Sequence, residues 1–283
     1  VGRFRRNRVI MPLHSNLFME WPLGSLKLRG LKTYLNCADT ILALGTQQKL
    51  HLLRMGFDSQ KVVIFPNTCE LQPITQQDLL RKHSASSKTS CLFLSNLIDT
   101  KGYPEYVEAC CLLQDSGCSL DAVLCGAYVD SGFNKRFSSF SEVKPFIEQA
   151  ITQIQSSGVA TLTWVQGAQG AAKQVLFEQA QIFVFPTRIA AEAQPLVIIE
   201  AMATGAAIIT SSFRELPDLV DASCAIVLDE VTPQAVAAAM KRLIDNPQLR
   251  VELATHALAR FEERFSSERF TERWKKMTLG LIE

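Results

Sequence analysis

The sequence predicts an α/β fold with one complete, doubly wound Rossmann-like domain and part of a second Rossmann-like domain. Short apolar runs alternate with longer helical patterns through most of the 283 residues, which is typical of parallel βαβ units. Six of the expected strands follow residue 90, which is enough for one complete sheet. Only two clear strands and one helix precede that point, so we expect the chain to start midway through its first domain.

The expected strands are short apolar runs, in the order 39–45, 62–65, 91–97, 121–125, 161–165, 182–185, 207–210 and 225–228, with a further candidate at 9–13. The expected helices lie between or after them, at 47–55, 104–114, 142–155, 171–179, 195–203, 233–245, 247–260 and 267–281. Several of these helices begin with proline, which suits the first helical turn because no hydrogen bond is lost there. The Ser-, Gly- and Phe-containing stretch 130–141 is expected to be a flexible loop.

A change of pattern divides the chain after residue 68. The stretch that follows is polar through Ser84 to Lys88 and has no strand pattern, so it is expected to be a linker or a surface helix. The boundaries are therefore expected at 1–68 for the partial domain, 69–89 for the linker, and from residue 90 for the complete domain.

Composition excludes some classes of function. With 29 Lys and Arg against 28 Asp and Glu, the chain offers no charge-based reason for nucleic acid binding. A local cluster, formed by Arg3, Arg5, Arg6 and Arg8, fits either a solvated strand edge or contact with an anionic acceptor or lipid, so peripheral membrane contact stays open. The eight cysteines show no metal-ligand spacing, and several lie in apolar runs. No apolar run reaches the length of a membrane span, and we expect a cytoplasmic protein.

The strongest candidate site is a pair of carboxylates, Glu192 and Glu200, with seven residues between them. Glu192 lies in the loop after the strand at 182–185, and Glu200 lies on the next helix. Such loops line the ligand crevice of a parallel sheet, and a helix start offers free N–H groups. Carboxylates accept hydrogen bonds from sugar and ribose hydroxyls. The intervening backbone is expected to hold a diphosphate or sugar oxygens: Ala193, Gln194, Pro195 and Leu196.

Taken alone, the pair also fits a solvated loop charge and a charge on a helix face. Glu200 is harder to explain in that way, because its neighbours on the helix are apolar and a buried carboxylate without a partner is costly.

These residues resemble a known family. Phe185-Pro-Thr187, Glu192, Glu200-Ala-Met-Ala-Thr-Gly205 and Leu216-Pro-Asp-Leu-Val220 are similar to the E-x7-E region of GT-B-fold retaining glycosyltransferases of family 4, the glycosyl transferases group 1. The resemblance implies a donor domain at 90–264, an amino-terminally truncated acceptor domain, and a last helix at 265–283 that crosses back to it. It further implies that Glu200 holds the ribose of the donor and Glu192 the hydroxyls of the transferred sugar.

A second part of the resemblance is Phe93-Leu-Ser-Asn-Leu97 followed by Lys101-Gly102. In the family, the loop after the first donor-domain strand carries an arginine and a lysine that bind the donor diphosphate. Lys101 matches the lysine, whereas Ser95-Asn96 stands at the usual Gly-Arg position, so one expected cation is missing. Lys101 and helix N-termini are then expected to neutralise the leaving diphosphate. Taken alone, Lys101 also fits a lysine in a turn.

Three further residues match the family by position. Gly126 and Gly167 follow strands at places where family members let the nucleotide base lie against the backbone, although both also fit ordinary turns. His14 matches a histidine that faces the donor sugar, which makes it a catalytic candidate beside Lys101 and Glu192. It also fits a hydrogen-bonded loop histidine.

The resemblance implies transfer of a sugar from a nucleotide diphosphate sugar to a hydroxyl of a carbohydrate, lipid or small-molecule acceptor, with retention at the anomeric carbon. No cofactor or metal is expected, since lysine and amides can carry the phosphates and no Asp-x-Asp motif occurs. A non-catalytic nucleotide-sugar-binding or scaffolding protein and a GT-B-fold nucleotide-sugar epimerase remain as alternatives. A dinucleotide-dependent oxidoreductase fits least, because Gly167-Ala-Gln-Gly170 lacks the full G-x-G-x-x-G fingerprint.

Overall fold

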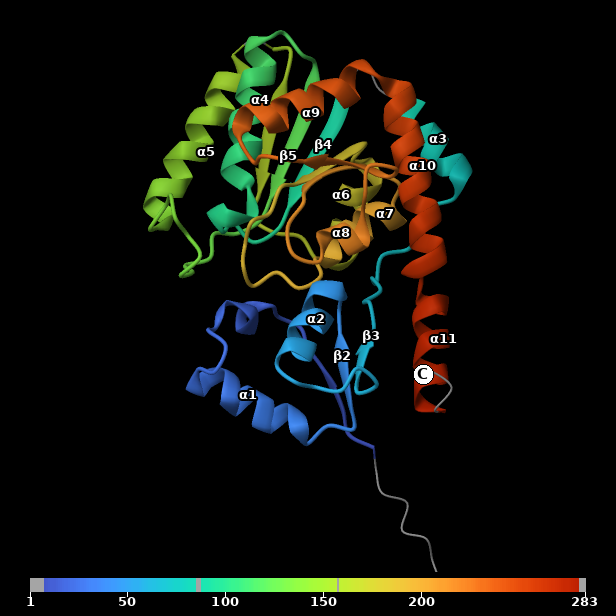
Figure 1. Cartoon of the computed structure of the whole chain (residues 1–283). Coiled ribbons are helices and arrows are strands. Elements are labelled where there is room, and N and C mark those ends of the chain that lie inside the picture. Colours follow the sequence, from blue (N-terminus) through green and yellow to red (C-terminus); the bar gives the residue numbers. More distant parts are fainter. Residues whose placement is uncertain (1–7, 85–87, 157, 280–283) are drawn as a thin grey trace, which may run out of the picture.

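The computed structural model describes residues 8–84, 88–156 and 158–279. These residues form two parallel β-sheets, each packed with helices, and the two units lie one above the other in Figure 1. Arg3, Arg5 and Arg6 of the basic cluster lie outside the described residues, as does the end of the helix expected at 267–281. Among the helices of the described ranges, none has the length and apolar composition needed to cross a membrane.

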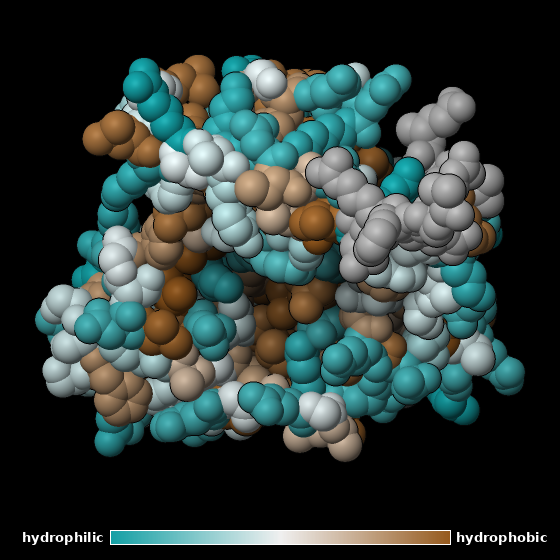
Figure 2. All heavy atoms as spheres, turned by 90° about the horizontal axis from the view of Figure 1, so that it is seen from below, coloured by the Kyte–Doolittle hydropathy of each residue, from teal (hydrophilic) through white to brown (hydrophobic). Residues whose placement is uncertain are grey.

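The N-terminal unit contains a three-stranded sheet in the order β1-β2-β3, with β1 at Ile10–Pro12, β2 at Thr40–Ala43 and β3 at Val62–Ile64. Its helices are the 3-10 helix η1 (Leu17–Glu20), α1 (Leu26–Asn36) and α2 (Thr46–Arg54). Buried residues from these elements, including Leu35, Ile41 and Leu52, form its core. Seen from the end that this unit forms, hydrophilic side chains surround a hollow with a hydrophobic floor (Figure 2).

The larger unit contains a six-stranded parallel sheet in the order β6-β5-β4-β7-β8-β9. Its strands are β4 (Thr89–Leu94), β5 (Leu120–Cys125), β6 (Thr161–Val165), β7 (Ile182–Phe185), β8 (Ala207–Ser211) and β9 (Ala225–Leu228). Counted from the first strand of the unit, this is the order 3-2-1-4-5-6 of a doubly wound Rossmann sheet. The expected fold class is confirmed. The strand order reverses between β4 and β7, and this switch point positions the site.

Helices pack against the large sheet, among them α4, α5 and α9, which lie side by side on one face of it (Figure 1). They are α4 (Tyr103–Asp115), α5 (Phe140–Gln155), α6 (Gly170–Gln179), α7 (Leu196–Ala203), α8 (Leu216–Leu219), α9 (Pro233–Asp245) and α10 (Pro247–Arg264), with the 3-10 helix η2 (Asp99–Lys101) after β4. Local chemistry explains several helix starts. Thr232 and Asn246 accept hydrogen bonds from the first turns of α9 and α10, and each precedes a proline.

Two segments join the units. Within 69–89, Gln76–Ser84 forms α3, and its buried Leu79 and His83 pack it into the larger unit. At the other end, α11 (Ser267–Thr278) lies beside β3 of the N-terminal unit (Figure 1). The ring of Phe65 contacts Phe270 of α11 at 5.1 Å between centroids, and Met277 joins the same buried cluster. The last described helix therefore packs on the N-terminal sheet.

Candidate active site

Lys101 and Glu192 meet at the switch point of the large sheet. Lys101 ends η2, which follows β4, and Glu192 lies in the loop between β7 and α7. Because β4 and β7 are paired in parallel, their carboxyl ends lie side by side. The Nζ atom of Lys101 is 3.6 Å from Oε2 of Glu192, and the two side chains are 19% and 15% exposed. The sheet thus brings an ammonium group and a carboxylate together where parallel sheets bind ligands.

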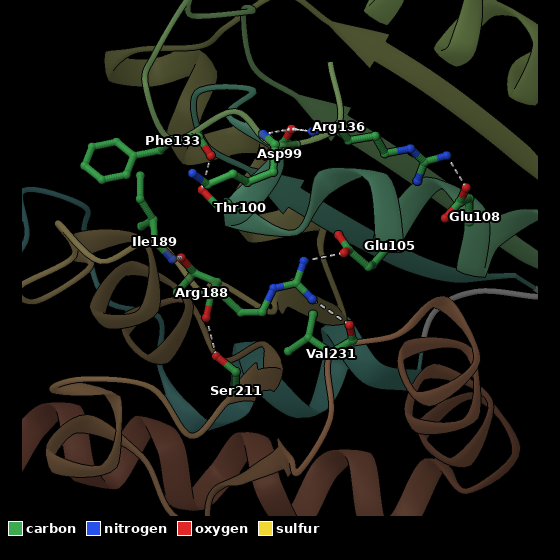
Figure 3. Close-up of polar contacts among 12 residues, drawn as sticks. Asp99, Thr100, Glu105, Glu108, Phe133, Arg136, Arg188, Ile189, Ser211 and Val231 are labelled. Carbon is green, nitrogen blue, oxygen red and sulfur yellow. Dashed lines mark hydrogen bonds and ion pairs between the residues drawn. The ribbon is translucent and has the colours of Figure 1, made fainter. Parts of the chain in front are cut away.

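A buried aspartate fixes the short helix that carries Lys101. Oδ2 of Asp99 accepts hydrogen bonds from the backbone N–H groups of Lys135 at 2.5 Å, Arg136 and Phe137 at 3.2 Å. Figure 3 shows Asp99 facing this loop, with the Arg136 side chain extending to Glu108. The backbone N–H of Asp99 also donates to Oδ1 of Asn134 at 3.1 Å, and the Thr100 hydroxyl donates to the carbonyl oxygen of Phe133 at 3.1 Å. The stretch that the sequence suggested to be a flexible loop is therefore anchored to η2, mainly through the Asp99 carboxylate.

Arg188 links the loop after β7 to the loop after β4. Its backbone N–H donates to the carbonyl oxygen of Thr100 at 2.7 Å. Its guanidinium donates to Glu105 of α4 at 2.5 Å and to the carbonyl oxygen of Val231 at 2.6 Å (Figure 3). Because Thr100 precedes Lys101 and the same loop leads to Glu192, these bonds hold the two charged residues in register.

A pocket of about 560 Å³ lies at the carboxyl ends of β4, β5 and β6. Three residues predicted to bind the donor line it: Asn96, Gly126 and Gly167. Gly126 is sterically required, since a Cβ atom there would lie 1.9 Å from the carbonyl oxygen of Ser95. The missing side chain lets the two strand ends approach, so the pocket has backbone rather than bulky side chains at this point.

A larger pocket of about 700 Å³ lies at the opposite edge of the sheet, where β4 and β7 begin. It is lined by residues of α3 and α6, including Lys82, and by none of the predicted site residues. The Lys82 ammonium donates to the carbonyl oxygens of Phe177 and Thr204, near the ends of α6 and α7. This lysine caps helix ends, which gives it a structural task.

Glu200 is buried next to the smaller pocket. It lies on α7 one turn after Val197, which lines the pocket, and is 5% exposed. Its Oε1 accepts a hydrogen bond of 2.6 Å from Nζ of Lys173, on α6. Its Oε2 is buried and has no hydrogen-bond partner. Burial raises the pKa of Glu200, and the neighbouring Lys173 ammonium opposes that rise.

The segment from Ala193 to Leu196, expected to hold a diphosphate or sugar oxygens, is not part of the pocket lining, which includes the next residue, Val197. Ala193, Gln194 and Pro195 are buried, whereas Leu196 is exposed. Proline has no N–H, so only the other three can offer an amide to a phosphate. The Gln194 side chain contacts the N-terminal unit, where it accepts from Asn67 N–H at 2.6 Å and donates to the carbonyl oxygen of Leu44 at 3.1 Å.

His14 is exposed in the loop after β1. Two residues later, the fully buried Asn16 donates through Nδ2 to the carbonyl oxygen of Glu192 at 2.8 Å. The backbone N–H of Asn16 also donates to the carbonyl oxygen of Ala191 at 3.2 Å. The loop that carries His14 is therefore docked on the loop that carries Glu192.

Two carboxylates of the larger unit accept hydrogen bonds from the free backbone N–H groups at the N-terminus of α2. Glu215 accepts from the backbone N–H groups of Gln47 at 3.0 Å and Gln48 at 2.6 Å, and Asp218 accepts from Thr46 at 2.5 Å. A Cβ atom on Gly45 would lie 2.2 Å from Oε2 of Glu215, so glycine is needed for this approach. Acidic side chains at a helix start are electrostatically favourable. Burial raises the pKa of Glu215, and its backbone hydrogen bonds oppose the rise.

Sequence reasoning did not single out Asn16, Lys173 or Glu215. Each acts through a partner that is distant in the chain, and no spacing rule reveals such partners. One local feature did point to such a contact. A helix that starts at Thr46, directly after a glycine, has free backbone N–H groups that a carboxylate from another part of the chain can bind. Within the described ranges, no group of three or more His, Cys, Asp or Glu side chains is arranged to hold a metal ion.

The comparison with protein families decides the assignment. Residues 76–260 match the sequence model of the family described as glycosyl transferases group 1. The chain belongs to this family. In this group 1 glycosyltransferase, the matched segment contains Lys101, Glu192, Glu200 and the whole pocket at the carboxyl ends of the large sheet.

Solved structures of glycosyltransferases share the fold. Sucrose-phosphate synthase from Thermosynechococcus elongatus is 18% identical, with 96% of this chain and 67% of that chain covered and a TM-score of 0.72. HepE from Anabaena in complex with UDP is 17% identical, with 97% and 72% covered and a TM-score of 0.75. A glycosyltransferase from Rickettsia africae is 14% identical, with 96% and 70% covered and a TM-score of 0.69. No curated protein sequence matches the chain. These neighbours show a Rossmann-like GT-B architecture for this chain.

Proposed function

We propose that this glycosyltransferase moves a sugar from a nucleotide diphosphate sugar to an acceptor hydroxyl, with retention at the anomeric carbon, as a member of family 4. The observation that carries the proposal is the Lys101–Glu192 pair at the switch point, 3.6 Å apart, with the pocket of Asn96, Gly126 and Gly167 at the same edge of the sheet. A cation for phosphate and a carboxylate for sugar hydroxyls are the two groups that such a donor requires.

The pocket supports a nucleoside diphosphate donor. Its volume of about 560 Å³ falls in the range of small-molecule sites, and its lining includes several small residues at the ends of three strands. HepE from Anabaena, a structural neighbour, was solved with UDP and with UDP-glucose. In the proposed complex the base lies against Gly126 and Gly167, the ribose lies toward Glu200, and the diphosphate lies toward Lys101.

In this proposal Lys101 stabilises the negative charge that grows on the departing diphosphate. Charge stabilisation by a preorganised donor is the dominant electrostatic task in such a reaction. Glu192 accepts hydrogen bonds from the hydroxyls of the transferred sugar, and the amides of Ala193, Gln194 and Leu196 add donors. His14 faces the sugar from the N-terminal unit, whose loop is docked on the Glu192 loop through Asn16.

The proposed mechanism needs no separate nucleophilic carboxylate, because the acceptor attacks the face from which the diphosphate leaves. The leaving phosphate then takes the proton of the acceptor hydroxyl. Lysine and amides carry the phosphate charge, so the proposal includes no cofactor and no metal. It places the enzyme in the cytoplasm, with a carbohydrate, lipid or small-molecule acceptor and room for peripheral membrane contact.

The test is a panel of nucleotide sugars that is screened for thermal stabilisation of the protein, because a ligand that binds only the folded state raises its unfolding temperature. The best donor is then incubated with an acceptor panel, and nucleotide release and the anomeric configuration of the product are measured. Glu200→Ala should abolish the stabilisation while the protein remains folded.

Three outcomes would replace the proposal. Stabilisation without turnover on any acceptor indicates a binding or scaffolding protein. The observation that favours this alternative is that Asn96 stands where the family is expected to have an arginine. Conversion of the nucleotide sugar to its epimer without acceptor indicates an epimerase. Product of inverted configuration contradicts the retaining mechanism.

A further inference from the structure

Glu200 carries one engaged and one unengaged carboxylate oxygen. Oε1 receives the Lys173 ammonium at 2.6 Å, and Oε2 is buried without a hydrogen-bond partner. A buried acceptor without a donor loses the hydrogen bonds that water would have given it. A bound ligand that supplies a hydroxyl would remove this deficit, so the free oxygen marks the place of an expected ligand hydroxyl.

Lys173 reaches Glu200 from a different element of the pocket wall. It lies on α6, one turn after Gln169, and Gln169 lines the pocket together with Val197 of α7. The Lys173 side chain is 22% exposed and that of Glu200 is 6% exposed, so the pair is shielded from water. Ion pairs of this kind are charge-assisted and hold their partners in a fixed geometry.

The other groups that face Glu200 do not replace this lysine. Glu70, in the segment after β3, is negatively charged and repels the carboxylate. Cys69 lies in the same segment, and burial, with a contribution from Glu200, raises the pKa of its thiol to about 11, so that it is neutral at ordinary pH. Among the charged groups that act on Glu200, Lys173 is the one that favours its ionised form.

We propose that Lys173 is a positioning residue for donor binding, which holds Oε1 of Glu200 so that Oε2 is presented to a ribose hydroxyl of the nucleotide. The inference rests on the proposed function, because it assumes that a nucleotide occupies the pocket of Asn96, Gly126 and Gly167. It adds a second lysine and glutamate pair to the site. Lys101 pairs with Glu192 on the sugar side, and Lys173 pairs with Glu200 on the ribose side.

The experiment measures binding of nucleoside diphosphates by calorimetry. Wild-type protein is titrated with UDP, GDP and ADP, and the tightest of these is then compared with its 2′,3′-dideoxyribose analogue. The variants are Lys173→Met, Lys173→Arg, Glu200→Gln and the double variant. Lys144→Met is the matched control, since Lys144 forms an exposed ion pair with Glu148 on α5, away from the pocket.

Lys173→Met should weaken binding of the ribonucleotide about tenfold and change binding of the dideoxy analogue less than twofold, because the lysine acts through the ribose contact. Lys173→Arg should restore most of the affinity. In the Glu200→Gln background, Lys173→Met should have no further effect, since residues that act as one unit are not additive. Lys144→Met should leave both affinities unchanged.

The pH dependence gives a readout that a purely structural role would not change. Nucleotide affinity of the wild type should fall on acidification as Glu200 takes up a proton. Removing the Lys173 charge leaves burial and Glu70, which both raise the pKa of Glu200, so the fall should begin at higher pH in Lys173→Met. If that variant does not fold, Lys173→Gln takes its place.

Equal losses of affinity for the ribonucleotide and the dideoxy analogue, or no loss for either, would overturn the role of Lys173 while the proposed function stands. If the wild type binds none of the three nucleotides, the proposed function fails, and the inference fails with it. The two failures are thus distinguished by the wild-type titration.

Discussion

Nζ of Lys101 lies 3.6 Å from Oε2 of Glu192, although the two residues follow different strands of the sheet. The ammonium group also lies 5.9 Å from the centre of the Phe185 ring, at the end of β7. Both side chains keep some exposure to solvent, 19% for Lys101 and 15% for Glu192, so a phosphate can compete with the carboxylate for the lysine. The parallel pairing of β4 with β7 therefore brings together two residues that are far apart in the sequence.

Lys101→Met should reduce turnover of the nucleotide sugar about a hundredfold, because one preorganised charge on the leaving group is removed. The fold should survive, since the two charged groups are 3.6 Å apart, beyond hydrogen-bond distance, and such loose ion pairs add little stability. Initial rates of nucleotide release, with circular dichroism as a check on folding, measure the effect. Lys144→Met is the control, and an unchanged rate for Lys101→Met would contradict the assigned role.

Asp99→Ala should loosen the loop at 130–139, which then keeps only the bonds of Asn134 and Phe133 to η2. Three backbone N–H groups lose the acceptor that Oδ2 provides, and a charge-assisted bond to each is worth about 1.5–3 kcal/mol before relaxation. We expect faster tryptic cleavage after Lys135 and Arg136, and lower turnover because η2 carries Lys101. Asp130→Ala, in the same loop, is the control, and equal cleavage rates for both variants would show that Asp99 does not anchor the loop.

Stability should fall on acidification because of His83. Nε2–H of this buried ring donates to the carbonyl oxygen of Gly205 at 2.9 Å, and Nδ1 accepts from Nε of Arg250 at 3.3 Å, so protonation would set two N–H groups against each other. Burial lowers the pKa of His83 from 6.5 to about 4. The unfolded chain therefore binds the proton more readily, and the contribution is present above pH 6.5 and is lost as pH falls toward 4, by up to about 3 kcal/mol.

Denaturant unfolding at a series of pH values measures this loss. His83→Gln should lower stability at neutral pH and flatten the dependence between pH 6.5 and pH 4. His256→Gln, which changes an exposed histidine of α10, should leave the slope as it is. A wild-type slope that survives in His83→Gln would assign the effect to other groups.

Glu215→Ala should loosen the contact between the units, because Gln47 and Gln48 lose the acceptor for their backbone N–H groups. Leaving buried donors unpaired costs about 1–3 kcal/mol each. We expect faster hydrogen exchange at the start of α2 and a larger radius of gyration in solution scattering. Glu230→Ala, at an exposed position, should change neither. Unchanged exchange in Glu215→Ala would mean that the carboxylate does not hold the interface.

The large sheet could be predicted from the sequence because its strands are buried on both faces and read as continuous apolar runs. The run at 182–185, for example, is fully buried in β7. Helix α1 was missed although Leu28, Leu31 and Leu35 have helical spacing, since Gly30 interrupts it and lowers helix propensity. Local pattern thus sufficed where burial was complete and failed where a glycine weakened a partly exposed helix.

The candidate site divides in a similar way. Lys101, Glu192 and Glu200 could be selected from sequence because motif spacing and position after strands mark them. Lys173 could not be selected, because its contact with Glu200 depends on how α6 packs beside α7. The bonds of Gln194 to Leu44 and Asn67 depend on how the two units meet, and no local pattern encodes that arrangement.

The C-terminal helix packs on the N-terminal sheet, so the polypeptide crosses between the units twice, once between β3 and α3 and once between α10 and α11. The two units are therefore joined by two covalent connections. A rotation about the line through both crossings would disturb the connections least, whereas twisting or sliding would strain both of them. A rotation of this kind would separate Asn16 from Glu192 when the units part and would restore the same hydrogen bond when they meet again.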